Sequence, residues 1–235
     1  MSIEGNGSNG YGFTAATPDI DSAAFTIEFW LKPLRAPVFA GEGGSVLDGI
    51  LGKWQSTNWR DGAWQMFDAQ ARNITYEQST PGNYGAAISP VGSLINNVWH
   101  HFAWRHGAGG ENGVFVDGGV NQYDGGVLDI PDKDSWPFWL FRAFSNQPGG
   151  SNGSYFNGRM GELRMWNEYR TEEQIRRYYR ERISQNAANL AHYYPMWETT
   201  GMVITDLVAG LNFTINAGMS WSSDTPPFSV FGGIA

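Results

Sequence analysis

Residues 156–179, FNGRMGELRMWNEYRTEEQIRRYY, join a strand pattern directly to the start of a helix. In residues 161–166 the apolar Leu163 and Met165 alternate with side chains of another kind, namely Glu162, Arg164 and Trp166. A period of two is typical of a strand with one face in a core and the other toward solvent. The stretch therefore predicts a half-buried strand that ends near Asn167.

A helix start follows the strand within a few residues. Thr171 has Gln174 three positions later, which is the spacing of a capping box, and two glutamates occupy the first turn. Arginines fill the later turns, where the helix dipole favours positive charge. The pattern predicts one short helix near residues 171–183, with an apolar face made of Ile175, Tyr178, Tyr179 and Ile183.

The rest of the chain has β patterns. Residues 25–31, FTIEFWL, alternate cleanly, and residues 98–106, VWHHFAWRH, form an aromatic strand pattern followed by VFVD and a glycine turn. The 31 glycines and 11 prolines indicate many tight turns. We expect an all-β, two-sheet antiparallel sandwich of residues 1–225 with the single helix packed on it, and an extended tail of residues 226–235.

Composition limits the possible partners and compartments. The net charge of −8 argues against general binding to nucleic acid or anionic membranes. Cysteine is absent, which excludes disulfides and thiolate chemistry. The first residues lack the basic and apolar regions of a Sec signal, and no apolar run is long enough to insert in a membrane. These features predict a virion-surface or extracellular location reached without a Sec signal, or the cytoplasm for a cellular lectin.

The order of several segments resembles the laminin-G-like, pentraxin-like branch of the concanavalin A-like jelly rolls. The resemblance rests on FTIEFWLKP, ILGKW, VWHHFAWR, VFVDGG, GRMGELRMWNEYRTEEQI and LAHYYPMW, spread over residues 20–200. It implies a jelly-roll sandwich and a family of carbohydrate- and protein-binding modules, with glucanases in neighbouring branches. One acidic position of the family pattern is replaced here by Gly161.

Catalytic motifs are weak. Related glucanases carry several carboxylates on one strand, whereas Glu28 and Glu162 each stand alone in theirs. GGSNG at residues 149–153 lies in a glycine-rich loop and not at the strand-to-helix elbow that a nucleophilic serine needs. GNGSNG at residues 5–10 fits the glycine pattern of a dinucleotide site, but it has neither a predicted strand before it nor a predicted helix after it, so we exclude such a site. We predict no enzyme activity, and a glycoside hydrolase is the disfavoured alternative.

The histidines and aspartates give no placed metal site. His100 and His101 are neighbours in a strand and point to opposite faces, so they cannot chelate one ion together. We expect packing and hydrogen-bonding roles for the four histidines, and no cofactor. Laminin-G-like and pentraxin-like modules often bind calcium, so a structural calcium stays open, with the candidate ligands Asp61, Asp117, Asp124, Asp129, Asp132 and Asp134.

One polar loop contains an isolated tryptophan. Sugar recognition combines an aromatic ring face with amide and carboxylate groups that hydrogen-bond hydroxyls. Such a mixture occurs at Trp54, Gln55, Asn58, Trp59, Arg60 and Asp61, and a weaker copy at Asn121, Tyr123 and Asp124. Aromatic residues more often fill a β core, but Trp59 has polar neighbours on both sides. The first group is the predicted ligand-binding loop.

Two functions remain after these exclusions. The first hypothesis is a surface binding and structural protein, most plausibly a phage-type virion decoration or adhesion protein with lectin-like capacity. The second is a free-standing cellular lectin that binds glycans. The expected partners are a glycan or other subunits of a particle, including copies of this chain.

Overall fold

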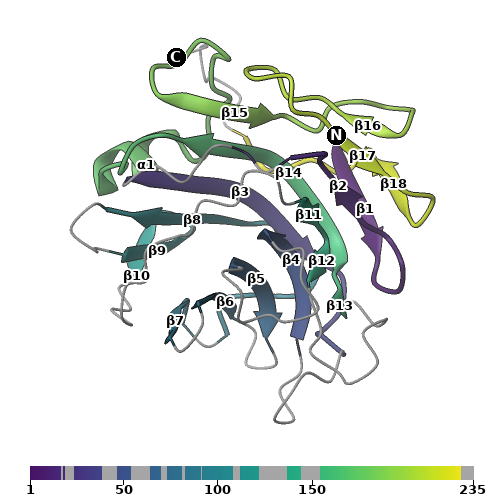
Figure 1. The fold of residues 1–235 in the computed structure, drawn as a ribbon, viewed down its shortest axis with the longest axis horizontal. Helices are drawn as coiled ribbons and strands as arrows, with labels where there is room; N and C mark the ends of the chain where they lie inside the picture. Colours follow the sequence, from purple (N-terminus) through teal and green to yellow (C-terminus); the bar gives the residue numbers. More distant parts are fainter. Residues whose placement is uncertain are drawn as a thin grey trace.

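The computed structural model describes residues 1–16, 18, 24–38, 47–53, 64–69, 73–80, 83–90, 92–107, 112–121, 137–143 and 154–228. Two antiparallel sheets dominate it (Figure 1). Sheet A has the spatial order β10 (Gly119–Asn121), β9 (Asn112–Val116), β8 (His100–His106), β3 (Phe25–Pro33), β14 (Asn157–Trp166), β1 (Ser2–Asn6) and β18 (Met219–Ser222), with β15 (Leu190–Tyr194) also paired to β14.

Sheet B lies across the core from sheet A. Its spatial order is β16 (Val203–Ile204), β17 (Phe213–Ile215), β2 (Gly12–Phe13), β11 (Phe138–Leu140), β4 (Leu47–Lys53), β5 (Trp64–Ala69), β6 (Ile74–Thr80) and β7 (Asn83–Ile88). A two-stranded ribbon is formed by β12 (Arg142–Ala143) and β13 (Ser154–Tyr155). The predicted all-β sandwich with one helix is confirmed.

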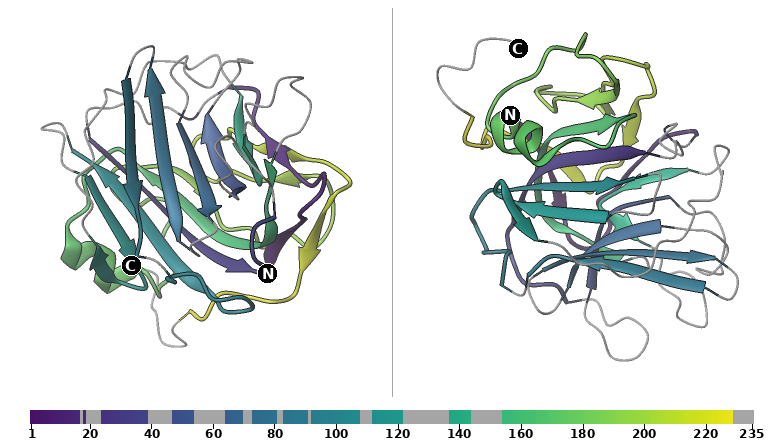
Figure 2. Two further views of the ribbon diagram at one scale, coloured as in Figure 1. Left: turned by 90° about the horizontal axis from the view of Figure 1, so that it is seen from below. Right: turned by 90° about the vertical axis from the view of Figure 1, so that its left-hand side faces the viewer.

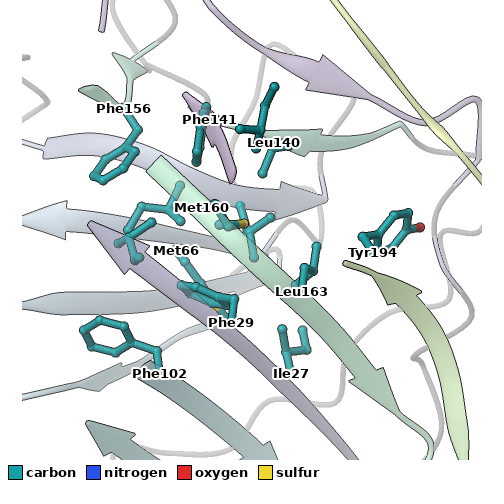
Figure 3. Packing of buried hydrophobic residues seen from close by; sticks show 14 of the residues in the cluster. Ile27, Phe29, Met66, Phe102, Leu140, Phe141, Phe156, Met160, Leu163 and Tyr194 are labelled. Atoms are coloured by element: carbon teal, nitrogen blue, oxygen red, sulfur yellow. The ribbon is translucent and has the colours of Figure 1, made fainter. Parts of the chain in front are cut away.

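The core lies between the two sheets. Phe29 and Met160 enter it from sheet A, and Met66 and Leu140 enter it from sheet B, all at most 1% exposed (Figure 3). Removal of this apolar surface from water, at ~25 cal/mol per Å², is the main force that holds the sheets together. Outside the sandwich, α1 (Glu172–Tyr178) lies on the side of sheet A that faces away from sheet B (Figures 1 and 2).

Strand β14 is the centre of sheet A. It pairs with β3 along one edge, and its other edge is shared by β1 at Asn157–Met160 and β15 at Leu163–Trp166. The register with β3 shifts between Gly161 and Arg164, and Glu162 has φ 57°. Such a bulge bends a strand, and here it separates the half of β14 that pairs with β1 from the half that pairs with β15.

The prediction of a half-buried strand at residues 161–166 was wrong in one respect. Glu162, Arg164 and Trp166 are at most 2% exposed, although the alternation places them opposite Leu163 and Met165. The reason is tertiary, because α1 and the chain around it cover this face (Figure 2). Both faces of β14 are therefore buried.

The capping box is confirmed, but the helix is shorter than predicted. The Gln174 backbone N–H donates to Thr171 Oγ1, and the Thr171 N–H donates to the Gln174 side chain at 2.6 Å. The α-helix itself ends at Tyr178, not near residue 183. Side chains from sheet A bind the carbonyls that another helical turn would use: Arg164 donates to Tyr178 and Glu181, and Trp30 donates to Tyr179.

Residues 7–9 bend between β1 and β2, and a strand does begin before the glycine motif. β1 contains Gly5 and Asn6, and it is held by pairing with β14 and β18, which the local sequence does not show. Asn6 Oδ1 accepts the backbone N–H groups of Ser8, Asn9 and Gly10. The chain then continues into β2 and not into a helix, so the exclusion of a dinucleotide site stands.

No helix within the described ranges is long and apolar enough to cross a bilayer.

Candidate functional site

The predicted ligand-binding loop cannot be placed. Trp54, Gln55, Asn58, Trp59, Arg60 and Asp61 all lie outside the described residues, as do Tyr123, Asp124, Asp129, Asp132 and Asp134. The loop does begin directly after Lys53, the last residue of β4, which pairs with Phe138 of β11. β11 carries Trp139, which belongs to a second candidate site that the sequence did not predict.

Four aromatic side chains gather on the outer face of sheet B, and we call them the aromatic platform. The ring centroids of Tyr11 and Trp139 are 5.6 Å apart, those of Phe13 and Trp139 are 5.7 Å apart, and Tyr155 lies 6.4 Å from Tyr11. These separations are typical of interacting aromatic pairs. Phe13 is 37% exposed and the other three are partly exposed. The platform therefore presents ring surface toward solvent.

A guanidinium group lies against the same rings. The Arg142 Cζ atom is 4.7 Å from the Trp139 ring centroid, 5.1 Å from that of Tyr11 and 5.9 Å from that of Tyr155. Cation–π contacts of this kind contribute about 0.5–1 kcal/mol at exposed sites. Arg142 sits on β12 beside Tyr155 of β13, so the small ribbon fixes the position of the charge relative to the rings.

The platform belongs to a row of side chains that crosses sheet B. Val203 pairs with Thr214, Thr214 with Phe13, and Phe13 with Trp139. Directly paired residues of an antiparallel sheet project from the same face, and Val203 and Thr214 are exposed. We call these four residues the cross-strand row. Their neighbours within the strands, such as Leu140 and Ile204, point into the core and are fully buried.

Beyond Trp139 the register continues into the longer strands. Gly52 of β4 pairs with Trp139, Gln65 of β5 pairs with Gly52, and Glu77 of β6 pairs with Gln65. Gly52 has no side chain and is buried, so the exposed part of the register ends at Trp139.

A second concentration of polar groups lies on sheet A, but it is sealed. Arg164 Nη2 is 2.9 Å and Nε 3.1 Å from Glu162 Oε2, and the Tyr193 hydroxyl donates to Glu162 Oε1 at 2.8 Å. Burial raises the pKa of Tyr193, and the nearby Glu162 charge raises it further. These three residues are at most 2% exposed, so a substrate has no access to them.

Glu28 extends this cluster under the helix. Its carboxylate lies 2.9 Å from Arg170 Nε and 3.4 Å from His101 Nε2. Burial would raise the pKa of Glu28, but His101, Arg170 and Arg164 outweigh burial and hold it below its ordinary value. Burial lowers the pKa of His101 more than Glu28 raises it, so the imidazole is neutral at pH 7. We call Glu28, His101, Glu162, Arg164, Arg170 and Tyr193 the ion cluster.

The histidines pack and form polar contacts, as predicted. His100 Nδ1 lies 2.8 Å from Asp117 Oδ2, and His192 Nδ1 lies 2.8 Å from Asp206 Oδ2. In both cases the other carboxylate oxygen accepts the backbone N–H of the residue that follows the histidine. These hydrogen bonds outweigh burial and lower the pKa of both aspartates. The four histidines are at most 8% exposed.

Asp117, the one described calcium candidate, is therefore engaged in a strand-and-turn contact. Within the described ranges no group of three or more histidine, aspartate or glutamate residues is arranged to hold a metal ion.

Sequence patterns alone did not identify the platform. Tyr11 and Phe13 stand next to a glycine-rich turn, while Trp139 lies in a short apolar run that reads as core. The alternation within Phe138–Leu140 does contain the signal, because it places Trp139 opposite two core residues. The pairing of β2 with β11, which are more than a hundred residues apart in the chain, is what brings the rings together.

Comparison with known proteins gives one family and several structures with the same fold. A sequence model described as the concanavalin A-like lectin/glucanases superfamily matches residues 6–176. No protein with curated information matches the sequence. Among solved structures, a candidate carbohydrate-binding protein from Bacteroides ovatus superposes with a TM-score of 0.64 at 21% identity, over 98% of this chain. This chain spans only 62% of that protein's length.

Two further structures share the fold at lower identity. A heptameric SAP-like pentraxin from Limulus polyphemus matches with a TM-score of 0.56 and 13% identity, over 93% of this chain and 92% of its own. A Ruminococcus gnavus sialidase module, CBM40, bound to α2,3-sialyllactose, matches with a TM-score of 0.55 and 12% identity, over 76% of this chain and 96% of its own. At these identities the likeness concerns the fold alone.

Proposed function

The chain belongs to the concanavalin A-like lectin/glucanases superfamily, and from this premise we propose that it is a non-catalytic carbohydrate-binding module. The observation that carries the proposal is the aromatic platform with Arg142 on the exposed face of sheet B. Binding sites for small ligands are lined mainly by aromatic and apolar groups, with a few polar groups that fix orientation. A sugar ring presents apolar C–H groups to such rings and hydroxyls to the surrounding donors and acceptors.

The carboxylates support a binding role over hydrolysis. A glycosidase needs two carboxyl groups that flank the scissile bond within an open site. Glu28 and Glu162, the two that the sequence singled out, are 0% and 1% exposed and lie in ion pairs under the helix. On the platform itself, the described members carry rings and one guanidinium but no carboxylate. Two of the proteins with a similar fold are a candidate carbohydrate-binding protein and a module bound to α2,3-sialyllactose, which supports this proposal.

A glycan array followed by calorimetry tests the proposal. Trp139→Ala is expected to weaken binding of the best sugar by at least about 30-fold, the ~2 kcal/mol of a buried aromatic anchor. Trp197→Ala is the matched control: Trp197 is 48% exposed but is not a platform residue, and its loss should leave affinity unchanged. Failure to bind any sugar, with or without calcium, would refute the function.

The predicted ligand-binding loop enters the same experiment. Trp59→Ala weakens binding if the loop that follows β4 also contacts the sugar, since β4 pairs with β11. A loss with Trp139→Ala alone assigns binding to the platform. A loss with Trp59→Ala alone moves the site to the loop.

We also propose that the module is displayed on a particle, as a virion decoration or adhesion protein. In this proposal the extended tail of residues 226–235 is the docking arm. Its first residues lie on sheet A, where Pro226 packs against Gly161 and the Phe228 ring centroid is 6.2 Å from that of Trp30. Deletion of residues 229–235 is expected to abolish assembly and to spare sugar binding, and a neighbouring capsid gene is expected. A cellular lectin would show neither.

A further inference from the structure

The cross-strand row is longer than one sugar. Val203, Thr214, Phe13 and Trp139 occupy four adjacent strands in a continuous register. Neighbouring strands are about 4.8 Å apart, so three intervals span ~14 Å at right angles to the strands. A single pyranose ring covers only part of this distance. The platform is one end of the row, and the exposed Val203 is the other.

We infer that the cross-strand row holds a linear, uncharged oligosaccharide whose chain runs across the strands from Trp139 to Val203. This inference rests on the proposed function and adds the class of ligand. The sugar nearest Trp139 stacks on the platform. Sugars further along lie over Phe13 and Thr214, where a hydroxyl group is available for hydrogen bonding, and the chain end contacts Val203.

The charge of the surface favours an uncharged chain. None of the four row side chains is ionisable, and the protein as a whole has a net charge of −8, which repels an acidic polymer. Arg142 lies beside only one end of the row, with its guanidinium stacked against the rings of Trp139 and Tyr11. It therefore meets one sugar of the chain, whereas an acidic polymer would present a charge at every repeat.

The first test compares polymers and lengths with the intact protein. Neutral probes are β-1,3-glucan, β-1,4-glucan, mannan and xylan, and acidic probes are polygalacturonate and polysialic acid. For the best neutral polymer, oligosaccharides of one to six units are titrated by calorimetry. Affinity is expected to rise at least tenfold from the monosaccharide to the longer members and then to level off. Equal affinity at all lengths, or tighter binding of an acidic polymer, would overturn the inference.

A pair of variants locates the effect. Val203→Asp is expected to lower affinity for the hexasaccharide about tenfold and to leave monosaccharide binding unchanged. Met202→Asp is the control, because Met202 is equally exposed, at 46% against 45%, but it lies in the bend before β16 and outside the register of the row. Equal effects of the two variants would contradict the row.

The two proposals fail in different ways. No binding to any probe refutes carbohydrate binding, and the row with it. If binding depends on Trp139 but not on oligosaccharide length or on Val203, the carbohydrate-binding proposal is supported and the inference about the cross-strand row is refuted. Circular dichroism of each variant confirms that the fold is retained.

Discussion

On the outer face of sheet A, Glu28, Trp30 and Arg164 are at most 2% exposed, whereas on the outer face of sheet B, Phe13 is 37% and Val203 is 45% exposed. Both sets alternate with core residues along their strands, so the local patterns are alike. The difference is that α1 and the residues around it cover the outer face of sheet A (Figure 2).

The covered face contains charges and the exposed face contains rings, which reverses the usual expectation. A buried ion must have a partner, because its transfer from water costs several kcal/mol. Sheet A provides those partners in the ion cluster. Sheet B leaves aromatic surface exposed, and contiguous exposed apolar surface commonly marks a binding site. The contrast assigns structure to one face and recognition to the other, and four experiments test it.

The largest effect is expected from Arg164→Met. It removes the partner of Glu162 and the donor to the Tyr178 and Glu181 carbonyls. The free energy of unfolding should fall by about 3–5 kcal/mol, as for other buried pairs that lose one member. Urea denaturation measures it. Arg177→Met, on the exposed side of α1, should change stability by less than about 0.5 kcal/mol. Similar losses of unfolding free energy in both variants would mean that the buried contacts of Arg164 do not stabilise the fold.

A smaller loss is expected from Tyr193→Phe. The phenol donates to the buried Glu162 at 2.8 Å, and a hydrogen bond to a charged group contributes about 1.5–3 kcal/mol. Tyr155→Phe makes the same change on the platform and should remain within about 0.5 kcal/mol of the wild type. A larger loss of unfolding free energy in Tyr155→Phe than in Tyr193→Phe would contradict the comparison.

The third effect is a pH dependence to which the ion cluster contributes. The pKa of His101 is lower in the folded state than its ordinary value near 6.5, so the unfolded chain binds more protons. Stability should therefore fall as the pH drops from about 6.5 toward the folded pKa. At lower pH Glu28 acts in the same direction, since its pKa is also lowered. So does Asp224, outside the cluster: hydrogen bonds from Lys32, Trp99 and Arg159 outweigh burial and lower its pKa to about 2.

Urea midpoints at several pH values measure this slope. His101→Gln should flatten it between pH 6.5 and 5, whatever the variant's absolute stability. An unchanged slope in the variant would assign the acid sensitivity to other groups.

The smallest stability effect is expected from Phe13→Ser. The ring is 37% exposed, so its loss should cost less than about 1 kcal/mol, while sugar affinity falls. Leu140→Ala, at a fully buried position of the strand that pairs with β2, should instead cost about 2–5 kcal/mol and spare binding. A large loss of stability from Phe13→Ser would make the platform part of the core.

Most of the fold could be predicted from the sequence because its determinants are local. The capping box of Thr171 and Gln174 depends on four consecutive residues, and the alternation of residues 25–31 depends on seven. β1, β2 and β18 could not be recognised in this way, because they are short and their hydrogen bonds go to strands far along the chain.

The candidate site shows the same division. The sequence predicts that Trp59 contacts a ligand because polar neighbours surround it, but its loop lies outside the described residues. The sequence did not show that the platform rings lie together. Tyr11 and Phe13 are more than a hundred residues from Trp139 and Tyr155 in the chain.

The sequence by itself determined a sandwich with one capped helix, the inward-facing residues of its central strands and the absence of cysteine chemistry. These follow from periodicity, capping and composition, which act over a few residues or over the whole chain. Only the tertiary structure decided that the charges of residues 156–179 are sealed under the helix and that the rings of sheet B are exposed. The local pattern of an alternating strand separates its core face from its other face. Whether that other face is exposed or buried depends on which distant segment packs on it.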